Sequence, residues 1–250
     1  MTLYKFSTMV LSANYCLFMK TPKKYLTLAK NYQKFCTIMK LILTLVFLLP
    51  SLAFSQLFIT EVMSDSAGSG PTNGDWFELT NTGSSSINLN GWYWNDAADP
   101  LDDGAIFPDI TIASGSSIVI VDENSGNLPT WKDSWGLAAA TNIYSKDAFT
   151  ESGAGGDDFS GLGGSGDEIN IWDSSASNLI LSLSFGEATE GFSFQWDTSG
   201  NSLGLSSNGV NGAYSNGVDI ASPGSVIPEP STYALILASL VFVFRLYKRK

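Results

Sequence analysis

The residues best suited to chemistry in this sequence are carboxylates on glycine-rich loops. Four lie along one such stretch: Asp157, Asp158, Asp167 and Glu168. Four more lie on an earlier loop: Asp96, Asp99, Asp102 and Asp103. Hard oxygen ligands on flexible loops suit calcium, so the first set is a candidate calcium site. The competing interpretation is that both loops only keep the domain soluble, in which case the protein carries no cofactor.

Carboxylate pairs also perform the acid–base chemistry of glycoside hydrolases. The sequence pairs no two acids, and it lacks histidine altogether, which excludes Ser-His-Asp triads and His-ligated zinc. Glu61 and Glu78 fall in apolar stretches, where a carboxylate must find hydrogen-bond donors. We therefore expect structural roles for both residues and no enzyme activity, with a carboxylate-based hydrolase as one alternative.

The charge of the chain is unevenly distributed. All 24 acidic residues lie at or after Glu61, whereas the span between Gln56 and Phe244 contains only two basic residues, Lys132 and Lys146. That span therefore has a net charge of −22. Because such an acidic surface repels the phosphates of DNA and RNA, we expect no nucleic-acid partner. Both cysteines precede this span, so it can form no disulfide.

Residues 39–55 have the pattern of a signal peptide. Lys40 precedes an apolar run over residues 41–49, which is short for a membrane span. The small residues Ala53 and Ser55 follow, and cleavage is expected between Ser55 and Gln56. The partners implied are the secretion machinery and signal peptidase. Residues 1–38 are basic, and they are either an upstream extension or the result of a start assigned before Met39.

Residues 225–250 contain three parts in order. The first is an extended motif: Pro228, Glu229 and Pro230. An apolar run follows, just long enough to span a membrane as a helix. The last part is a basic cluster expected to stay cytoplasmic: Arg245, Lys248, Arg249 and Lys250.

This tripartite order resembles the PEP-CTERM sorting signal. The resemblance implies a single transmembrane helix, transient anchoring in the inner membrane and cleavage by an exosortase-type processing enzyme. It also implies a final location at the cell surface or in an extracellular polysaccharide matrix. The alternative is an ordinary C-terminal anchor.

Residues 56–224 form the remaining domain. Short apolar stretches alternate there with turn residues, which is typical of an all-β sandwich. The predicted strands are Leu57–Met63, Trp76–Asn81, Ile87–Trp94, Ala105–Ala113, Ser117–Asp122, Glu168–Trp172, Leu179–Phe185 and Phe192–Trp196. Period-two alternation predicts core-facing side chains at Ile169, Ile171, Leu179, Leu181, Leu183 and Phe185. The same alternation predicts Asn170 and Ser182 on the outside.

Several blocks of this domain occur in a recognisable order: Phe58–Met63, Gly74–Gly83, Ile87–Trp92, Ile106–Pro108, Ile112–Gly115, Gly166–Ile171 and Ala221–Gly224. Their order resembles the lamin tail domain, which implies an immunoglobulin-like β-sandwich. The stretch Glu123–Gly161 departs from the family pattern by its length.

These observations together predict an exported, non-enzymatic structural or adhesive module. The alternative is a module that binds the extracellular polysaccharide. Trp92 and Trp94 are expected in the core, although an exposed pair would form a sugar-stacking platform. The glycan-binding alternative predicts exposed aromatic side chains among three residues: Trp94, Trp131 and Trp135.

Overall fold

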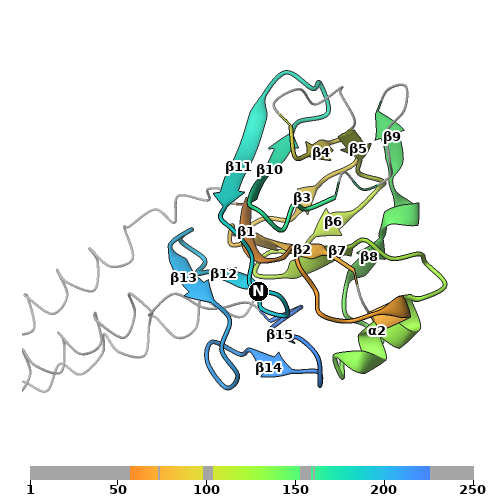
Figure 1. The fold of residues 1–250 in the computed structure, drawn as a ribbon. Helices are drawn as coiled ribbons and strands as arrows, with labels where there is room; N and C mark the ends of the chain where they lie inside the picture. The colour runs from red at the N-terminus through yellow and green to blue at the C-terminus, as the bar shows by residue number, and fades with distance from the viewer. Residues whose placement is uncertain (1–56, 73, 98–103, 153–158, 160, 226–250) are drawn as a thin grey trace, which may run out of the picture. The chain divides into compact units, whose positions relative to one another are not determined.

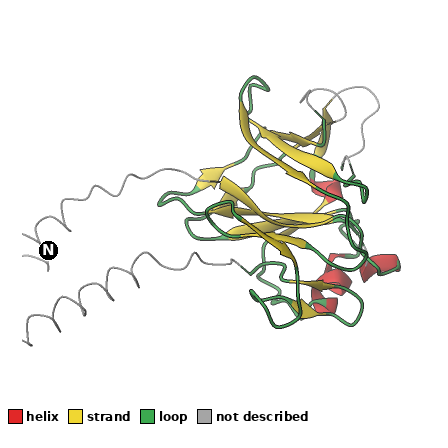
Figure 2. Cartoon of the chain, turned by 60° about the vertical axis from the view of Figure 1, so that its left-hand side comes forward, coloured by secondary structure: helices red, strands yellow, loops and turns green. Residues whose placement is uncertain are grey.

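The computed structural model describes residues 57–72, 74–97, 104–152, 159 and 161–225. Strands dominate this part of the chain, and the few helices are short (Figure 2). The strands are β1 (Leu57–Met63), β2 (Trp76–Asn81), β3 (Ile87–Asn88), β4 (Tyr93–Asn95), β5 (Gly104–Ile106), β6 (Thr111–Ile112), β7 (Ser117–Val121), β8 (Ile143–Ser145), β9 (Thr150–Ser152), β10 (Asp167–Trp172), β11 (Leu179–Phe185), β12 (Phe194–Trp196), β13 (Ser202–Leu205), β14 (Tyr214–Ser215) and β15 (Ile220–Ala221). The helices are η1 (Gly70–Thr72), α2 (Leu128–Ser134) and η2 (Lys146–Ala148).

Several predicted features lie outside the described residues. They are the upstream extension, the signal peptide with its cleavage position, the Pro228–Pro230 motif, the apolar run and the basic end. The same holds for several loop acids: Asp99, Asp102, Asp103, Asp157 and Asp158. Within the described ranges, no helix is long and apolar enough to cross a membrane.

Two sheets form the body of the domain. The six-stranded sheet has the order β13-β12-β1-β2-β7-β8, and only its β7–β8 pair is parallel. The five-stranded sheet has the order β11-β10-β4-β5-β9 and is antiparallel throughout. In Figure 1 the five-stranded sheet lies above the six-stranded sheet, and α2, β14 and β15 lie below it. Two-stranded pairs, β3–β6 and β14–β15, complete the topology.

The main core fills the space between the two sheets. The six-stranded sheet contributes Ile59, Val62, Phe77, Leu79, Ile118 and Ile120 to it. The facing sheet contributes Trp94, Ala105, Ile169 and Ile171. The Phe77 and Trp94 rings lie with centroids 4.9 Å apart, so the inner faces are in direct contact. This arrangement is that of a β-sandwich, which confirms the all-β sandwich that the sequence predicted.

The opposite face of the six-stranded sheet is buried as well. Met63, Trp76 and Val119 point to this side and pack against Trp131 of α2 and the following Trp135. The centroids of the Trp76 and Trp131 rings are 6.2 Å apart in an edge-to-face arrangement. Because both faces are covered, every residue of β2 is buried, and the strand lacks the usual polar alternation.

The bounds of β1, β2 and β11 confirm the prediction. The predicted strand Ile87–Trp94 is wrong, because a turn separates β3 from β4. The predicted strand Ala105–Ala113 is likewise split into β5 and β6.

The sequence pattern did not indicate the helix α2 between β7 and β8. The helix α2 presents Leu128 and Trp131 three residues apart, with Trp135 one turn later. A stripe this short does not stand out from the surrounding strand pattern.

Two facing predictions fail. Asn170 is 3% exposed, because its amide Nδ2 donates to the Ala97 carbonyl and to Glu168 Oε1 instead of facing water. Leu179 is 48% exposed, because the extra residue Ile180 in β11 shifts the register and pairs Leu179 with Trp172, on the face of the sheet opposite to Ile171. Ile169 and Ile171 are fully buried, as predicted.

Candidate functional site

The structure brings two carboxylates face to face, Glu61 on β1 and Glu78 on β2. They are direct partners in the antiparallel register, next to a bulge at Thr60. Each is at most 1% exposed. Like charges directly opposite one another destabilise a sheet, so this pair requires compensating contacts.

Glu61 is surrounded by donors from the C-terminal part of the domain. Its Oε1 accepts hydrogen bonds from Ser193 Oγ at 2.5 Å and from the Ser222 N–H at 2.9 Å. Its Oε2 accepts from Ser222 Oγ at 2.7 Å. Gln195 Nε2 donates to Ser222 Oγ at 2.7 Å and extends the network.

Glu78 is held in the same manner. Thr60 Oγ1 lies 2.5 Å from its Oε1, and Ser117 Oγ donates to Oε2 at 3.3 Å. The Gly224 N–H also donates to Oε2, at 2.7 Å. The expectation that both glutamates would find donors is therefore confirmed.

The pair fastens residues 222–224, here called the closing segment, to the centre of the six-stranded sheet. Burial raises the pKa of Glu61, although its hydrogen bonds oppose this rise. Burial, followed by the charge of Glu61, raises the pKa of Glu78 to about 7. Near neutral pH the two carboxyl groups thus resist carrying two full charges.

This geometry does not suit hydrolysis. A glycosidase needs its two acids across an open cleft that admits a sugar and water. Glu61 and Glu78 are covered by the closing segment, and their oxygens are occupied by donors of the protein itself. The chemistry that remains for them is structural.

Asp75 is a further described acid with a raised pKa. Burial, followed by the charges of Asp122 and Asp65, raises the pKa of Asp75 to about 7, while the Ser66 N–H opposes the rise. The backbone before β2 lies close to the backbone after β7: a Cβ at Gly74 would lie 2.8 Å from the Asp122 carbonyl oxygen. Among the described residues, no group of three or more His, Cys, Asp or Glu is arranged to hold a metal ion.

The described members of the candidate calcium set organise their own loop. Asp167 Oδ2 accepts the Gly163 N–H at 2.6 Å, and its Oδ1 accepts the Glu168 N–H at 2.9 Å. Glu168 Oε1 accepts from Asn170 Nδ2 at 2.9 Å. The other two proposed ligands are outside the described residues: Asp157 and Asp158. Calcium binding stays a prediction.

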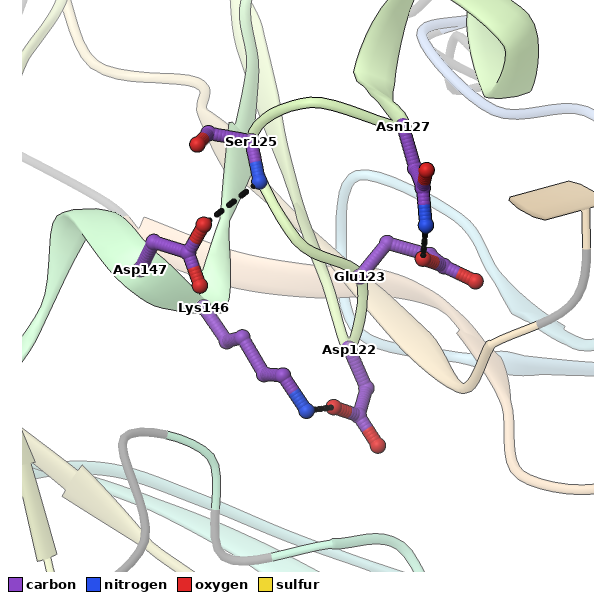
Figure 3. Close-up of polar contacts among 6 residues, drawn as sticks. All are labelled: Asp122, Glu123, Ser125, Asn127, Lys146 and Asp147. Atoms are coloured by element: carbon purple, nitrogen blue, oxygen red, sulfur yellow. Dashed lines mark hydrogen bonds and ion pairs between the residues drawn. The ribbon is translucent and has the colours of Figure 1, made fainter. Parts of the chain in front are cut away.

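Both lysines of the acidic span have local partners. Lys146 Nζ pairs with Asp122 Oδ1 at 2.8 Å, at a partly exposed position (Figure 3). Lys132 Nζ donates to the backbone carbonyl oxygens of Ala139 and Thr141, at 3.2 and 2.8 Å. Neither lysine therefore offers a free cationic site for a phosphate.

Figure 3 also shows how the loop after β7 is fixed. The Ser125 N–H donates to Asp147 Oδ2 at 2.6 Å, a bond that lowers the pKa of Asp147. Asn127 Nδ2 donates to Glu123 Oε2 at 2.7 Å just before α2 begins. These contacts position the helix whose tryptophans cover the sheet.

The three tryptophans that the glycan-binding alternative predicted to be exposed are in the core, where Trp94 was expected to lie. The side chains of Trp94, Trp131 and Trp135 are at most 1% exposed, so none of them can stack on a sugar. Trp92 is different, because it is only partly buried and packs at the margin of the main core.

Trp92 lines a surface groove of about 580 Å³, here called the Trp92 groove. The lining residues are Leu57, Phe58, Ser86, Ile87, Asn88, Trp92 and Ile180. They come from the start of β1, from β3 and its flanks, and from the edge strand β11. The sequence named Trp92 but did not predict the groove, whose walls come from three separate segments.

The sequence also missed the partners of the glutamates. Ser222 lies 161 positions from Glu61, and Ser193 lies 132 positions from it. The sequence analysis named the block Ala221–Gly224 only for its place in the order of blocks. That order did not indicate that the block would contact the glutamates.

Comparison with known proteins gives one family. A family profile described as Lamin Tail Domain matches residues 50–211. The match ends before the closing segment. No curated protein is similar enough to the chain to count as a match.

Proposed function

This chain belongs to the lamin tail domain family, and from that premise we propose that it is an exported, non-enzymatic structural or adhesive module of the cell surface or extracellular matrix. A lamin tail domain is a non-catalytic type of fold. The proposal adds export, the sorting route and the role in the matrix.

The buried glutamate pair carries the non-enzymatic part of the proposal. Glu61 and Glu78 are the acids placed most like a hydrolytic dyad, yet they serve to hold the closing segment on the sheet. A carboxylate-based hydrolase would need such a pair in contact with solvent. The domain uses its buried acids for cohesion instead.

The two ends of the sequence support export and sorting. Residues 39–55 have the order of a secretion signal, with cleavage before Gln56. Residues 225–250 have the order of a sorting tail, with Pro228–Pro230 outside the membrane and the basic end inside. An exosortase-type enzyme would then release the domain to the surface or matrix.

The intact mass of the native protein, recovered from host cells and from medium, tests this proposal. We expect a chain that begins at Gln56 and ends near Pro228–Pro230. Additional mass in hexose-sized steps would indicate attached glycan. A mature chain that still carries Arg245–Lys250 would mean an ordinary membrane anchor and would defeat the sorting part of the proposal.

A second candidate function is binding of the extracellular polysaccharide. The observation in its favour is the Trp92 groove, which presents aromatic and polar side chains together at the surface.

A further inference from the structure

We propose that the Trp92 groove binds a neutral saccharide chain. This inference deepens the proposed matrix function and rests on it for the source of the ligand. The site itself is argued from the residues that form the groove.

A tight turn builds one wall of the groove. The Trp92 N–H donates to the Leu89 carbonyl at 2.8 Å, which closes a four-residue turn between β3 and β4. Gly91 has a φ of 76°, which favours glycine at this position of the turn. The Phe107 N–H donates to the Trp92 carbonyl at 2.8 Å. The backbone of Trp92 is therefore hydrogen-bonded through both its N–H and its carbonyl. Trp92 is thus held at the surface by its backbone.

Aromatic faces are the first feature that suits a sugar. Trp92 and Phe58 are both partly exposed, whereas most other aromatic residues in the core clusters are buried. A flat ring with one face in the protein and one in water can cover the C–H side of a pyranose. A volume of about 580 Å³ lies within the usual range of small-molecule sites.

A fixed amide is the second feature. Asn88 Nδ2 donates to Asp109 Oδ1 at 2.9 Å and to Thr111 Oγ1 at 3.2 Å. Asn88 Oδ1 accepts the Asn90 N–H at 2.7 Å. The orientation of the amide is therefore set before any ligand arrives, and one lone pair of Oδ1 remains for a sugar hydroxyl. Ser86 adds an exposed hydroxyl on the same side.

An irregularity in the edge strand β11 contributes to the lining of the groove. On β11, Leu181 pairs with Ile171 and Leu179 pairs with Trp172, which leaves Ile180 without a partner on β10. An extra residue of this kind bends a strand and re-aims its side chains. Ile180 is 45% exposed and lines the groove, where it adds an apolar contact to those of the aromatic rings.

The charge of the domain favours a neutral saccharide over an acidic one. Among the described residues, those that line the groove include no Asp, Glu, Lys or Arg, although the domain around it is strongly acidic. Asp109, bonded to Asn88, adds negative potential nearby. A neutral chain meets no unpaired charge in this groove, whereas a uronate chain is repelled by the domain as a whole.

Titration of the full-length protein in lipid nanodiscs tests the inference. The neutral probes are cellohexaose, laminarihexaose and mannohexaose, and the acidic probe is a polygalacturonate oligomer of the same length. Binding is measured by calorimetry and by tryptophan fluorescence. We expect at least one neutral hexasaccharide to bind and the acidic oligomer to bind at least tenfold more weakly.

Three variants locate the binding. Trp92→Ala removes the ring, and Ser86→Lys places a long charged side chain at the groove from an exposed position. Both should weaken binding at least tenfold. Ser85→Lys is the matched control, since Ser85 is exposed, adjacent and not part of the lining. Should Trp92→Ala lose its folded circular dichroism spectrum, Ser86→Lys decides the question alone.

The result that overturns the inference is no binding of any neutral hexasaccharide up to millimolar concentration. Equal binding by Ser86→Lys and Ser85→Lys overturns it as well, because binding would then lie elsewhere. Failure here is separable from failure of the proposed function. A correctly processed, exported protein that binds no neutral sugar refutes only the groove, and an unprocessed chain that binds one refutes only the sorting proposal.

Discussion

Neutralising Glu78 tests whether the buried carboxyl pair makes the domain sensitive to pH. Burial and the neighbouring Glu61 raise the pKa of Glu78 from 4.5 to about 7. The folded state therefore keeps a proton there that the unfolded chain loses at lower pH. By linkage, the free energy of unfolding falls as pH rises from about 4.5 to about 7 and then levels off.

The size of this loss follows from the pKa values. Each pH unit is worth 1.36 kcal/mol for one proton, so the interval from 4.5 to about 7 corresponds to about 3 kcal/mol. The raised pKa values of Glu61 and Asp75 act in the same direction. The lowered pKa values of Asp173 and Asp197 act only at more acidic pH.

The substitution Glu78→Gln imitates the protonated carboxyl. Its Nε2 can donate to Thr60 Oγ1, because the Thr60 and Thr80 hydroxyls lie 2.8 Å apart and can reverse their bond. Its Oε1 can still accept the Gly224 N–H. We expect the variant to lose much less stability than the wild-type protein between pH 5 and pH 8, with a difference of about 3 kcal/mol at pH 8.

Urea unfolding of the full-length protein at pH 5, 6, 7 and 8, followed by tryptophan fluorescence, provides the measurement. The control is Glu187→Gln, the same substitution at an exposed position. The reasoning is refuted if wild-type stability is flat or rises over this interval. An unchanged pH dependence in Glu78→Gln would show that the pair is not its source.

Three further substitutions probe other contacts. Ser222→Ala leaves the buried Gln195 amide without its 2.7 Å partner, and urea unfolding should show a loss of about 1–3 kcal/mol, with faster amide exchange in the closing segment. Gly74→Ala places a methyl group 2.8 Å from the Asp122 carbonyl at a φ of 126°, so calorimetry should show a lower melting temperature and a loss of about 1–3 kcal/mol. Lys146→Met removes the partly exposed ion pair with Asp122, so a loss above about 1 kcal/mol in urea would contradict the assignment of this pair to the surface.

The sequence was most informative where structure is local. The strands β1, β2 and β11 were predicted with their observed bounds, because each combines an apolar run with flanking turn residues. The turn at Gly91 was missed, because apolar residues both precede and follow it in the sequence. The stretch Ile87–Trp94 therefore has the pattern of one continuous strand. Local patterns could not separate these two cases.

Neighbours that are distant in sequence decided the remaining features. Leu179 follows a core-facing alternation, but the pairing of β11 with β10 leaves Ile180 as an extra residue, so Leu179 lies opposite Trp172 and is exposed. Asn170 follows an outward alternation, but the Ala97 carbonyl across the sheet satisfies its amide in a buried position. For the same reason the sequence could require donors for Glu61 without identifying Ser222.

The closing segment has a mechanical consequence. Ser225 is the last described residue before the C-terminal tail. In a chain tethered by that tail, tension reaches residues 222–224 first, and Glu61 and Glu78 pass it to β1 and β2 at the centre of the six-stranded sheet. The edge strands carry no part of that first load. With the tail anchored as proposed, loss of these hydrogen bonds would free residues 222–224 and lengthen the tether, while β1 and β2 would stay paired.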